Sequence, residues 1–371
     1  MVNINGYEIK SAFSGGEPLK AIYSNGDKVW PTDEPVPVDW GGLKFTALEE
    51  GEIGMTHVGT NKTTTKPNLS YSKNGNYWVE WDYTPISVVT GDIVYFNGIN
   101  DRIGLYFNRD YSTFTSTCKI AASGNIMSLL YGNYFEGIIS LIDKDCCFHK
   151  LFENCSNLTT APELPATSLS NMCYSDMFAG CTSLTTAPVL PATILETDCY
   201  ACMFSGCKGL TTAPALPATE LKRYCYLHMF SGCTSLTTAP ALPATTLANQ
   251  CYVNMFSGCT SLTKAPALPA TKLAVGCYED MFYKCTSLIN APELPATSLK
   301  QHCYDFMFYG CTKLKYVKAN FLTEPGTDYT DRWLSGVYQF GTFYANFPEA
   351  TWPDIITRGE STVPAGWTIT K

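Results

Sequence analysis

The sequence is poor in charge and in histidine. Charged residues make up 16% of the 371 positions, with 25 Lys and Arg against 33 Asp and Glu, and only 4 histidines occur. A net charge of −8 without any basic run argues against a nucleic-acid partner, because phosphate binding needs clustered Lys and Arg. Neither Cys147 with His149 nor His302 with Cys303 has zinc-finger spacing, so we expect no bound metal and no cofactor.

Three further patterns are missing. No segment reaches the roughly 18 apolar residues of a membrane span, so membrane insertion is not expected. Residues 1–31 lack the basic start, apolar stretch and small-residue cleavage site of a secretory signal, and we expect synthesis in a cytoplasm without export by the usual route. No G-x-S-x-G, H-E-x-x-H or P-loop spacing occurs, and Glu163 and Glu293 lie too many repeats apart for a paired-carboxylate site. We therefore do not expect an enzyme.

A 26-residue repeat fills the middle of the chain. Each unit reads C-x-x-L-x-x-A-P-x-L-P-A-T-x-L-x-x-x-C-Y-x-x-M-F-x-x, and six copies begin at Cys155 and end before Cys311. A unit of this size cannot bury an apolar face alone, but copies stacked on one another can. The repeat therefore predicts a stacked array whose ends are atypical because they must cover the terminal cores.

Two halves of each unit predict different local structure. In "CYxxMFxxC" Cys173, Met177 and Cys181 lie four residues apart, which predicts one inward stripe of a short helix. "LTTAPALP" cannot be helical because of its two prolines, and only its "LTT" part can hold a parallel ladder. The predicted fold is mixed and β-rich, with one strand and one short helix per repeat.

Composition divides the chain into five regions. They are a small β anchoring module (1–31), a Pro-rich linker (32–38), a β-sandwich-like domain (39–126), a repeat solenoid with its N-terminal cap (127–314) and a C-terminal β cap (315–371). Five aromatic residues of the sandwich region favour a core, with a sugar-stacking platform as the alternative: Trp78, Trp81, Tyr83, Tyr95 and Phe96.

The repeat places cysteines in two columns. One contains Cys155, Cys181, Cys207, Cys233, Cys259, Cys285 and Cys311, and the other contains Cys147, Cys173, Cys199, Cys225, Cys251, Cys277 and Cys303. Neighbouring units about 4.8 Å apart are within disulfide range. However, stacked Cβ vectors are parallel, the total of 17 cysteines is odd, and cytoplasmic synthesis favours thiols. We interpret the columns as small buried side chains and not as disulfides.

Differences between the copies identify positions that the repeated apolar residues do not fix. We call those repeated apolar residues the frame. Variable positions follow "PAT", precede each "CY" and lie inside the predicted helix, and ten residues directly before "CY" are candidate ligand contacts: Glu196, Asp198, Lys222, Arg223, Tyr224, Asn249, Gln250, Lys300, Gln301 and His302. A solvated turn without function explains the same variation, and the paired threonines of "LTT" offer a second, flatter surface. Both alternatives stay open at this point.

The repeat "MFSGCTSLTTAPALPATTLANQCY" resembles the BspA-type leucine-rich repeats of Bacteroides and related gut bacteria, and the resemblance extends over about residues 39–371. It implies a curved leucine-rich-repeat solenoid used in adhesion or recognition, without catalytic residues. "IKSAFSGGEPLKAIYSNGDKVWP" resembles, less specifically, the amino-terminal β modules of tail and fibre proteins of Bacteroides phages.

Together the two resemblances imply a virion structural protein, such as a tail fibre, head fibre or decoration protein, made in the host cytoplasm and released by lysis. Its expected partners are other virion proteins through residues 1–31, a glycan or outer-membrane protein of the host surface, and further copies of itself in a homo-oligomer. The alternative is a BspA-like adhesin on a bacterial surface that binds host protein or glycan.

Overall fold

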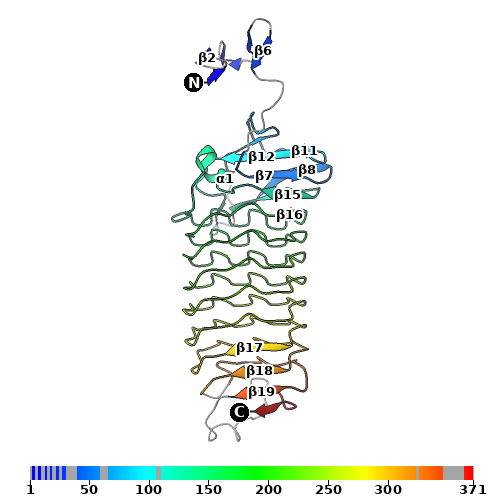
Figure 1. The fold of residues 1–371 in the computed structure, drawn as a ribbon, viewed down its shortest axis with the longest axis vertical. Helices are drawn as coiled ribbons and strands as arrows, with labels where there is room; N and C mark the ends of the chain where they lie inside the picture. The colour runs from blue at the N-terminus through cyan, green and yellow to red at the C-terminus, as the bar shows by residue number, and fades with distance from the viewer. Residues whose placement is uncertain are drawn as a thin grey trace.

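The computed structural model describes residues 40–58, 66–105, 110–322, 326–345 and 363–370, together with six short strands within residues 2–30. Most of the regular structure is β (Figure 1). The six strands form three antiparallel pairs, β1 with β2, β3 with β4 and β5 with β6. Their bounds are β1 (Val2–Ile4), β2 (Tyr7–Ile9), β3 (Phe13–Ser14), β4 (Glu17–Pro18), β5 (Ile22–Ser24) and β6 (Asp27–Trp30). The predicted linker 32–38 lies outside the described residues.

Two antiparallel sheets form the sandwich region. One has the order β10-β9-β12-β7-β15 and is continued by the parallel pairing of β15 with β16 (Leu158–Thr160) of the first repeat unit, and the other has the order β11-β8-β14-β13. The strands are β7 (Lys44–Ala47), β8 (Gly51–Val58), β9 (Leu69–Ser72), β10 (Val79–Glu80), β11 (Ile86–Val88), β12 (Ile93–Gly98), β13 (Gly104–Leu105), β14 (Asp110–Ser116) and β15 (Ile120–Ser123). Alternate residues of β12 are buried, as expected for a strand with one face on a core. The helix α1 (Ser128–Tyr131) and the 3₁₀ turn η1 (Gly132–Tyr134) follow.

Aromatic side chains of both sheets meet between them. The rings of Phe45 on β7 and Phe114 on β14 lie 5.0 Å apart, edge to face. Phe96 is fully buried and Trp81 is 3% exposed, and Tyr83 stacks on Trp81 at 5.0 Å. The interpretation of these aromatics as core is therefore confirmed for Trp81 and Phe96.

Below the sandwich the repeat units stack one on another (Figure 1). We call each 26-residue unit a rung and number the rungs 1 to 6 from those that begin at Cys155 and Cys285. The side that carries "LTT" is the strand side, and the side that carries "CYxxMFxx" is the turn side. The strands here are β16 (Leu158–Thr160), β17 (Asn290–Leu294), β18 (Tyr316–Ala319), β19 (Thr342–Ala345) and β20 (Thr368–Thr370), of which the last four form one parallel sheet.

Pairing on the strand side is sparse within the rungs. Parallel bridges join Thr160 to Thr186, Thr186 to Thr212, and Thr212 to Thr238. The prolines that follow supply no N–H group and interrupt the ladder in these rungs, whereas in rung 6 β17 pairs with β18 on both sides of Pro292. Parallel pairing through the "LTT" part is confirmed for these rungs, but its restriction to that part is wrong, because parallel bridges also join Ser168 to Ile194 and Glu220 to Thr246.

The predicted short helix of each repeat is wrong. In rung 1, Met172, Asp176 and Gly180 have φ values of 54°, 55° and 74°, and the segment is a series of turns. A left-handed residue at every fourth position closes one turn and starts the next. The four-residue period places Cys173, Met177 and Cys181 on one side, and all three are fully buried. The inward stripe is thus confirmed, although turns and not a helix produce it.

Alternate N–H groups of these turns bond in two directions. The N–H of Met177 closes a turn onto the carbonyl of Tyr174 at 3.2 Å, whereas the N–H of Phe178 donates to Met203 of the next rung at 2.9 Å. The same alternation recurs along the stack. A helix would use all these N–H groups internally and leave none for the neighbouring rung. Hydrogen bonds from the turns therefore connect neighbouring rungs on this side, as the ladder of a β-sheet would.

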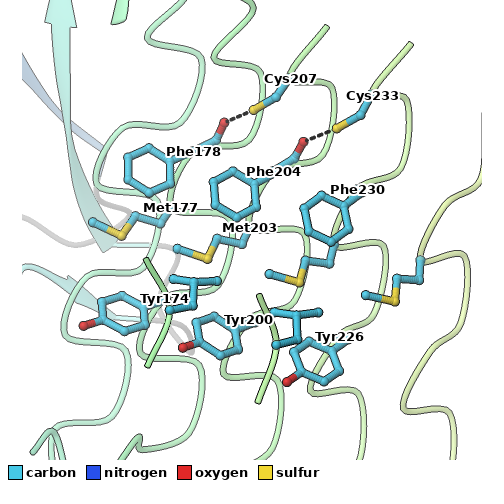
Figure 2. Close-up of a cluster of buried hydrophobic side chains, with 14 of the residues drawn as sticks. Tyr174, Met177, Phe178, Tyr200, Met203, Phe204, Cys207, Tyr226, Phe230 and Cys233 are labelled. Carbon is cyan, nitrogen blue, oxygen red and sulfur yellow. Dashed lines mark hydrogen bonds between the residues drawn. The ribbon is translucent and has the colours of Figure 1, made fainter. Parts of the chain in front are cut away.

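Identical side chains stack in columns inside the array (Figure 2). The ring centroids of Phe178 and Phe204 lie 5.6 Å apart, and those of Tyr174 and Tyr200 lie 5.9 Å apart. At the upper end Phe152 stacks both on Phe178 and, at 5.5 Å, on Phe114 of the sandwich. The sandwich and the array consequently share one apolar core, and the sandwich covers the first rung.

At the other end the fully buried Trp333 covers the last rung. Its ring lies 6.4 Å from Phe308 and 6.1 Å from Phe343 of β19. This part of the chain was assigned to the C-terminal cap by the sequence, and residues 323–325 and 346–362 of it lie outside the described residues. Within the described residues no helix has the length and apolar character needed to span a membrane.

The hydroxyl groups of Tyr174, Tyr200 and Tyr226 are buried without a hydrogen-bond partner. We expect Tyr200→Phe to stabilise the fold by about 1 kcal/mol, because an unpaired buried hydroxyl costs desolvation free energy that Phe avoids. Tyr252→Phe is the matched control. Tyr252 lies in the same column, but its hydroxyl is not one of the buried hydroxyl groups without a hydrogen-bond partner. Urea titration followed by circular dichroism measures both, and a lower midpoint for Tyr200→Phe than for the wild type would contradict the prediction.

Candidate functional site

Seven of the ten predicted contact residues lie together on the turn side of rungs 2 to 4. We call them the recognition patch: Glu196, Asp198, Lys222, Arg223, Tyr224, Asn249 and Gln250. Backbone bonds hold their rungs in register, since the N–H of Asp198 donates to the carbonyl of Arg223 at 3.2 Å. Asp198, Tyr224 and Gln250 all have φ between 56° and 59°. They occupy the first left-handed position of the turn series, where it leaves the preceding segment.

Arg223 lies at the centre of the recognition patch. Its guanidinium is 4.5 Å from the ring centroid of Tyr224, donates to the Tyr224 hydroxyl at 2.9 Å and donates to Oε1 of Gln250 at 3.4 Å. Lys222 lies 4.0 Å from Glu196, an exposed pair that adds little to stability. Burial raises the pKa of Asp198, and the charge of Arg223 opposes that rise. The patch thus presents cation, carboxylate, amide and aromatic groups within three adjacent rungs.

The other three predicted residues, Lys300, Gln301 and His302, lie on rung 6. Rung 5 separates them from the recognition patch and carries Val275 and Gly276 at the corresponding positions. His302 Nδ1 lies 2.5 Å from Asp305 Oδ2, and this hydrogen bond raises the pKa of His302. The structure therefore does not join these residues to the patch.

The cysteines of the first column have a defined hydrogen-bonding role (Figure 2). Cys207 Sγ donates to the carbonyl oxygen of Phe178 at 3.0 Å, and Cys233 Sγ donates to that of Phe204 at 3.1 Å. The same Phe178 oxygen accepts the N–H of Cys181, so the thiol fills its second acceptor site. Equivalent bonds join Cys181 to Phe152, Cys259 to Phe230, Cys285 to Phe256 and Cys311 to Phe282.

Both cysteine columns are buried, as predicted, and consist of thiols. Desolvation raises the pKa of their members, for example of Cys155 and Cys311 to about 12. A thiol held protonated in this way is a poor nucleophile and a poor metal ligand. Among the described residues no group of three or more His, Cys, Asp or Glu side chains is placed to hold a metal ion. The columns therefore belong to the frame.

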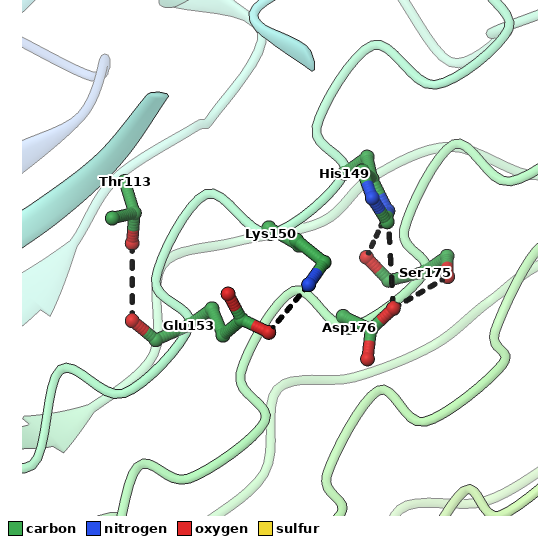
Figure 3. A network of polar contacts seen from close by, with 6 residues as sticks. All are labelled: Thr113, His149, Lys150, Glu153, Ser175 and Asp176. Atoms are coloured by element: carbon green, nitrogen blue, oxygen red, sulfur yellow. Dashed lines mark hydrogen bonds and ion pairs between the residues drawn. The ribbon is translucent and has the colours of Figure 1, made fainter. Parts of the chain in front are cut away.

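A polar cluster that the sequence did not reveal joins the sandwich to rung 1 (Figure 3). Lys150 Nζ lies 2.7 Å from Glu153 Oε1, and Thr113 of β14 donates its hydroxyl to the Glu153 carbonyl at 3.1 Å. His149 Nδ1 lies 3.1 Å from the carbonyl of Ser175 and 3.9 Å from Asp176 Oδ2. Burial is the largest influence on His149 and lowers its pKa to about 4. The ring is neutral at pH 7, and we therefore treat its contact with Asp176 as polar and not as an ion pair.

This cluster positions two elements and does not resemble a catalytic site. The ammonium group of Lys150 is engaged by Glu153, and the pKa of Asp176 is raised by burial. The sequence signal was weak but present, because the degenerate half-repeat "CFHKLFENC" carries Glu153 where rungs 1 to 4 carry Ala or Ser, and Asn154 where most rungs carry Gly. Those departures from the repeat mark the place where the array meets a different partner.

Thiol reactivity tests the buried columns. We expect native protein at pH 8 to react with Ellman's reagent at Cys202 at most, and slowly, because only Cys202 of the 17 cysteines is partly exposed and burial raises its pKa to about 12. In denaturant without reductant, 17 thiols should react. A lower count in denaturant would indicate disulfides along the columns and would contradict the assignment.

Comparison with protein-family models and with curated proteins gave no match to this chain. Its function is therefore argued from its own geometry. That geometry consists of a repeated buried frame, a mixed-charge patch on three adjacent rungs and a polar joint under the sandwich.

Proposed function

We propose that the chain is a leucine-rich-repeat solenoid of a phage virion, in a tail fibre, head fibre or decoration protein, and that it recognises the host-cell surface. The single observation that carries the recognition role is the recognition patch. There rungs 2 to 4 differ at every position, and their differing side chains lie next to one another on partly or fully exposed positions of adjacent rungs. Recognition needs this combination, a rigid support with a surface whose chemistry can change.

The frame supports the proposal because its buried contacts do not involve the side chains of the recognition patch. Cys225, Tyr226, Met229 and Phe230 are at most 1% exposed, and every rung repeats them. Lys222, Arg223 and Tyr224 precede them and enter none of these columns. Substitutions in the patch therefore leave the buried contacts between rungs intact.

The virion location rests on the resemblance of residues 1–31 to phage tail and fibre modules. Three short antiparallel strand pairs in this region fit a small β module. We assign docking on other virion proteins to it, with several copies of the chain per particle. The host ligand is then a surface glycan or an outer-membrane protein.

The alternative function is a BspA-like adhesin on a bacterial surface. It is favoured by the resemblance of the repeat itself, which carries "F-x-G-C-T-S-L" in several copies. Both functions use the same solenoid for recognition, and they differ in the particle that displays it.

Peptide mass spectrometry distinguishes the two. Density-purified phage particles and washed cell envelopes are digested in parallel, and the peptide around Trp78 and Trp81 is quantified. Stoichiometric amounts in particles support the virion protein. The peptide in envelopes alone would overturn that assignment in favour of the adhesin.

Substitution of the recognition patch tests the recognition role. Lys222→Ser, Arg223→Asn and Tyr224→Met together introduce the residues that rung 1 carries at the same positions, so the frame tolerates them. We expect binding of the labelled chain to host cells to fall at least about tenfold, because central Arg and Tyr residues supply most of the binding energy in protein interfaces.

The matched control is Lys264→Thr, which introduces the residue of rung 4 on the strand side and should leave binding unchanged. Equal cell binding by the triple variant and the wild type would remove the patch from the recognition surface.

A further inference from the structure

Three partly exposed aromatic side chains lie together on the turn side of rungs 5 and 6. We call Tyr283, Phe306 and Tyr309 the aromatic shelf. The rings of Tyr283 and Tyr309 stack at 5.0 Å with an angle of 8° between them, and Phe306 lies 6.1 Å from Tyr309. This is closer stacking than in the buried Tyr column, where the rings lie 5.7 to 6.0 Å apart.

The frame does not require these aromatics. The position of Tyr283 and Tyr309 is filled by Ala179, Ser205, Ser231 and Ser257 in rungs 1 to 4. Those rungs make the same turn, with the same hydrogen bond of the following residue to the next rung at 2.7 Å. Two tyrosines therefore replace small residues without any demand from the core.

Phe306 adds a second indication, from the backbone. It has a φ of 52°, in the left-handed region, which is unfavourable for a bulky side chain. The same position holds Asp176, Cys202, His228, Asn254 and Asp280 in the other rungs, and Asn is among the residues best suited to it. A phenylalanine kept in this conformation points to a use outside the fold.

One face of Tyr283 looks toward small neighbours. Tyr309 covers the face toward rung 6. Lys284 runs toward the same rung, with its Cγ 3.1 Å from the place of a Cβ on Gly310, and its ammonium nitrogen lies 5.0 Å from the centroid of the Tyr283 ring. On the side of rung 4 the corresponding residues are Ser257 and Gly258. The aromatic shelf thus lies next to small residues, serine and glycine, of the preceding rung.

Polar groups suited to hydroxyl recognition border the shelf. Asp280 begins the turn that carries Tyr283, and Asn254 occupies the same position one rung earlier and hydrogen-bonds to Asp280. Glu279 lies near Asp280 and adds a second carboxylate, whereas Asp305 is buried and is hydrogen-bonded to His302 and to the N–H of Asp331. Carboxylates accept hydrogen bonds from hydroxyl groups and repel anions.

We propose that the aromatic shelf binds a neutral oligosaccharide, with the apolar face of one sugar ring on Tyr283 and the sugar hydroxyls on Asp280 and Asn254. This inference rests on the proposed recognition function and names its ligand class. An acidic sugar or a phosphate group fits less well beside the carboxylates of Glu279 and Asp280. The two cations at the shelf are held against its rings, Lys284 at Tyr283 and Arg332 at Phe306.

The test uses the full chain and four free probes: cellohexaose, mannohexaose, maltohexaose and xylohexaose. Saturation-transfer NMR and titration calorimetry measure binding of each to the wild type and to Tyr283→Ser/Tyr309→Ser, which restores the serine of rung 4. We expect at least one probe to bind the wild type, and the double variant to raise its Kd at least about tenfold. Phe306→Asn, which introduces the residue of rung 4, is a second variant that the backbone should accept and should also weaken binding.

The recognition-patch triple variant serves as the control and should bind the oligosaccharide with unchanged Kd. Failure of all four probes at millimolar concentration, or equal Kd for wild type and Tyr283→Ser/Tyr309→Ser, overturns the inference. Neither result affects the proposed function, which depends on the particle and on cell binding. If host cells that lack surface glycan still bind the chain through the shelf, the partner is a protein and the oligosaccharide assignment is wrong.

Discussion

The alternation of hydrogen-bond direction along each turn series is the constraint on which the rest of the molecule depends. In rung 1 the N–H of Ser175 bonds backward within its turn, and the N–H of Asp176 bonds across to rung 2 at 2.8 Å. This alternation requires a left-handed residue at every fourth position, as at Asp176 and Gly180. It also forces equivalent residues of successive rungs to lie one above another. The prolines of the strand side prevent a continuous ladder there, so the turn side carries most of the cohesion between rungs.

Vertical alignment explains why the repeat is so uniform inside. Each buried side chain contacts mainly its own copy above and below, and a change of size in one rung would leave a cavity or a clash in two. Phe204 lies between Phe178 and Phe230 at 5.6 Å from each. Cysteine suits the first column for a related reason. The small thiol of Cys207 fits beside the phenylalanine column and donates to the carbonyl oxygen of Phe178, which accepts only one backbone hydrogen bond among the described residues. Serine or valine would each supply only part of this.

The sequence predicted the β-rich class, the inward stripe and the burial of both cysteine columns, since these follow from which residues are apolar and how they are spaced. It could not predict the turns, because a four-residue spacing of Cys173, Met177 and Cys181 is common to a helix and to a series of turns. The feature that separates them is the sign of φ at Met172 and Asp176. Nothing in their chemistry demands a left-handed backbone. The polar joint at His149 and Lys150 was missed because its partner, Thr113, lies far away in sequence.

The candidate sites follow from the same constraint. Variation between copies identified Arg223 and Tyr224, but only the stacking of rungs shows that Gln250 lies within reach of Arg223 and that Lys300 does not belong with them. Tyr283 and Tyr309 were hidden for the opposite reason. Each stands among variable residues in its own copy, and they form a shelf only when rungs 5 and 6 are placed together. The side chains of such a surface change by substitution within one rung, but the shape of the surface depends on the neighbouring rung. Two neighbouring rungs are therefore the smallest unit that can evolve a binding site.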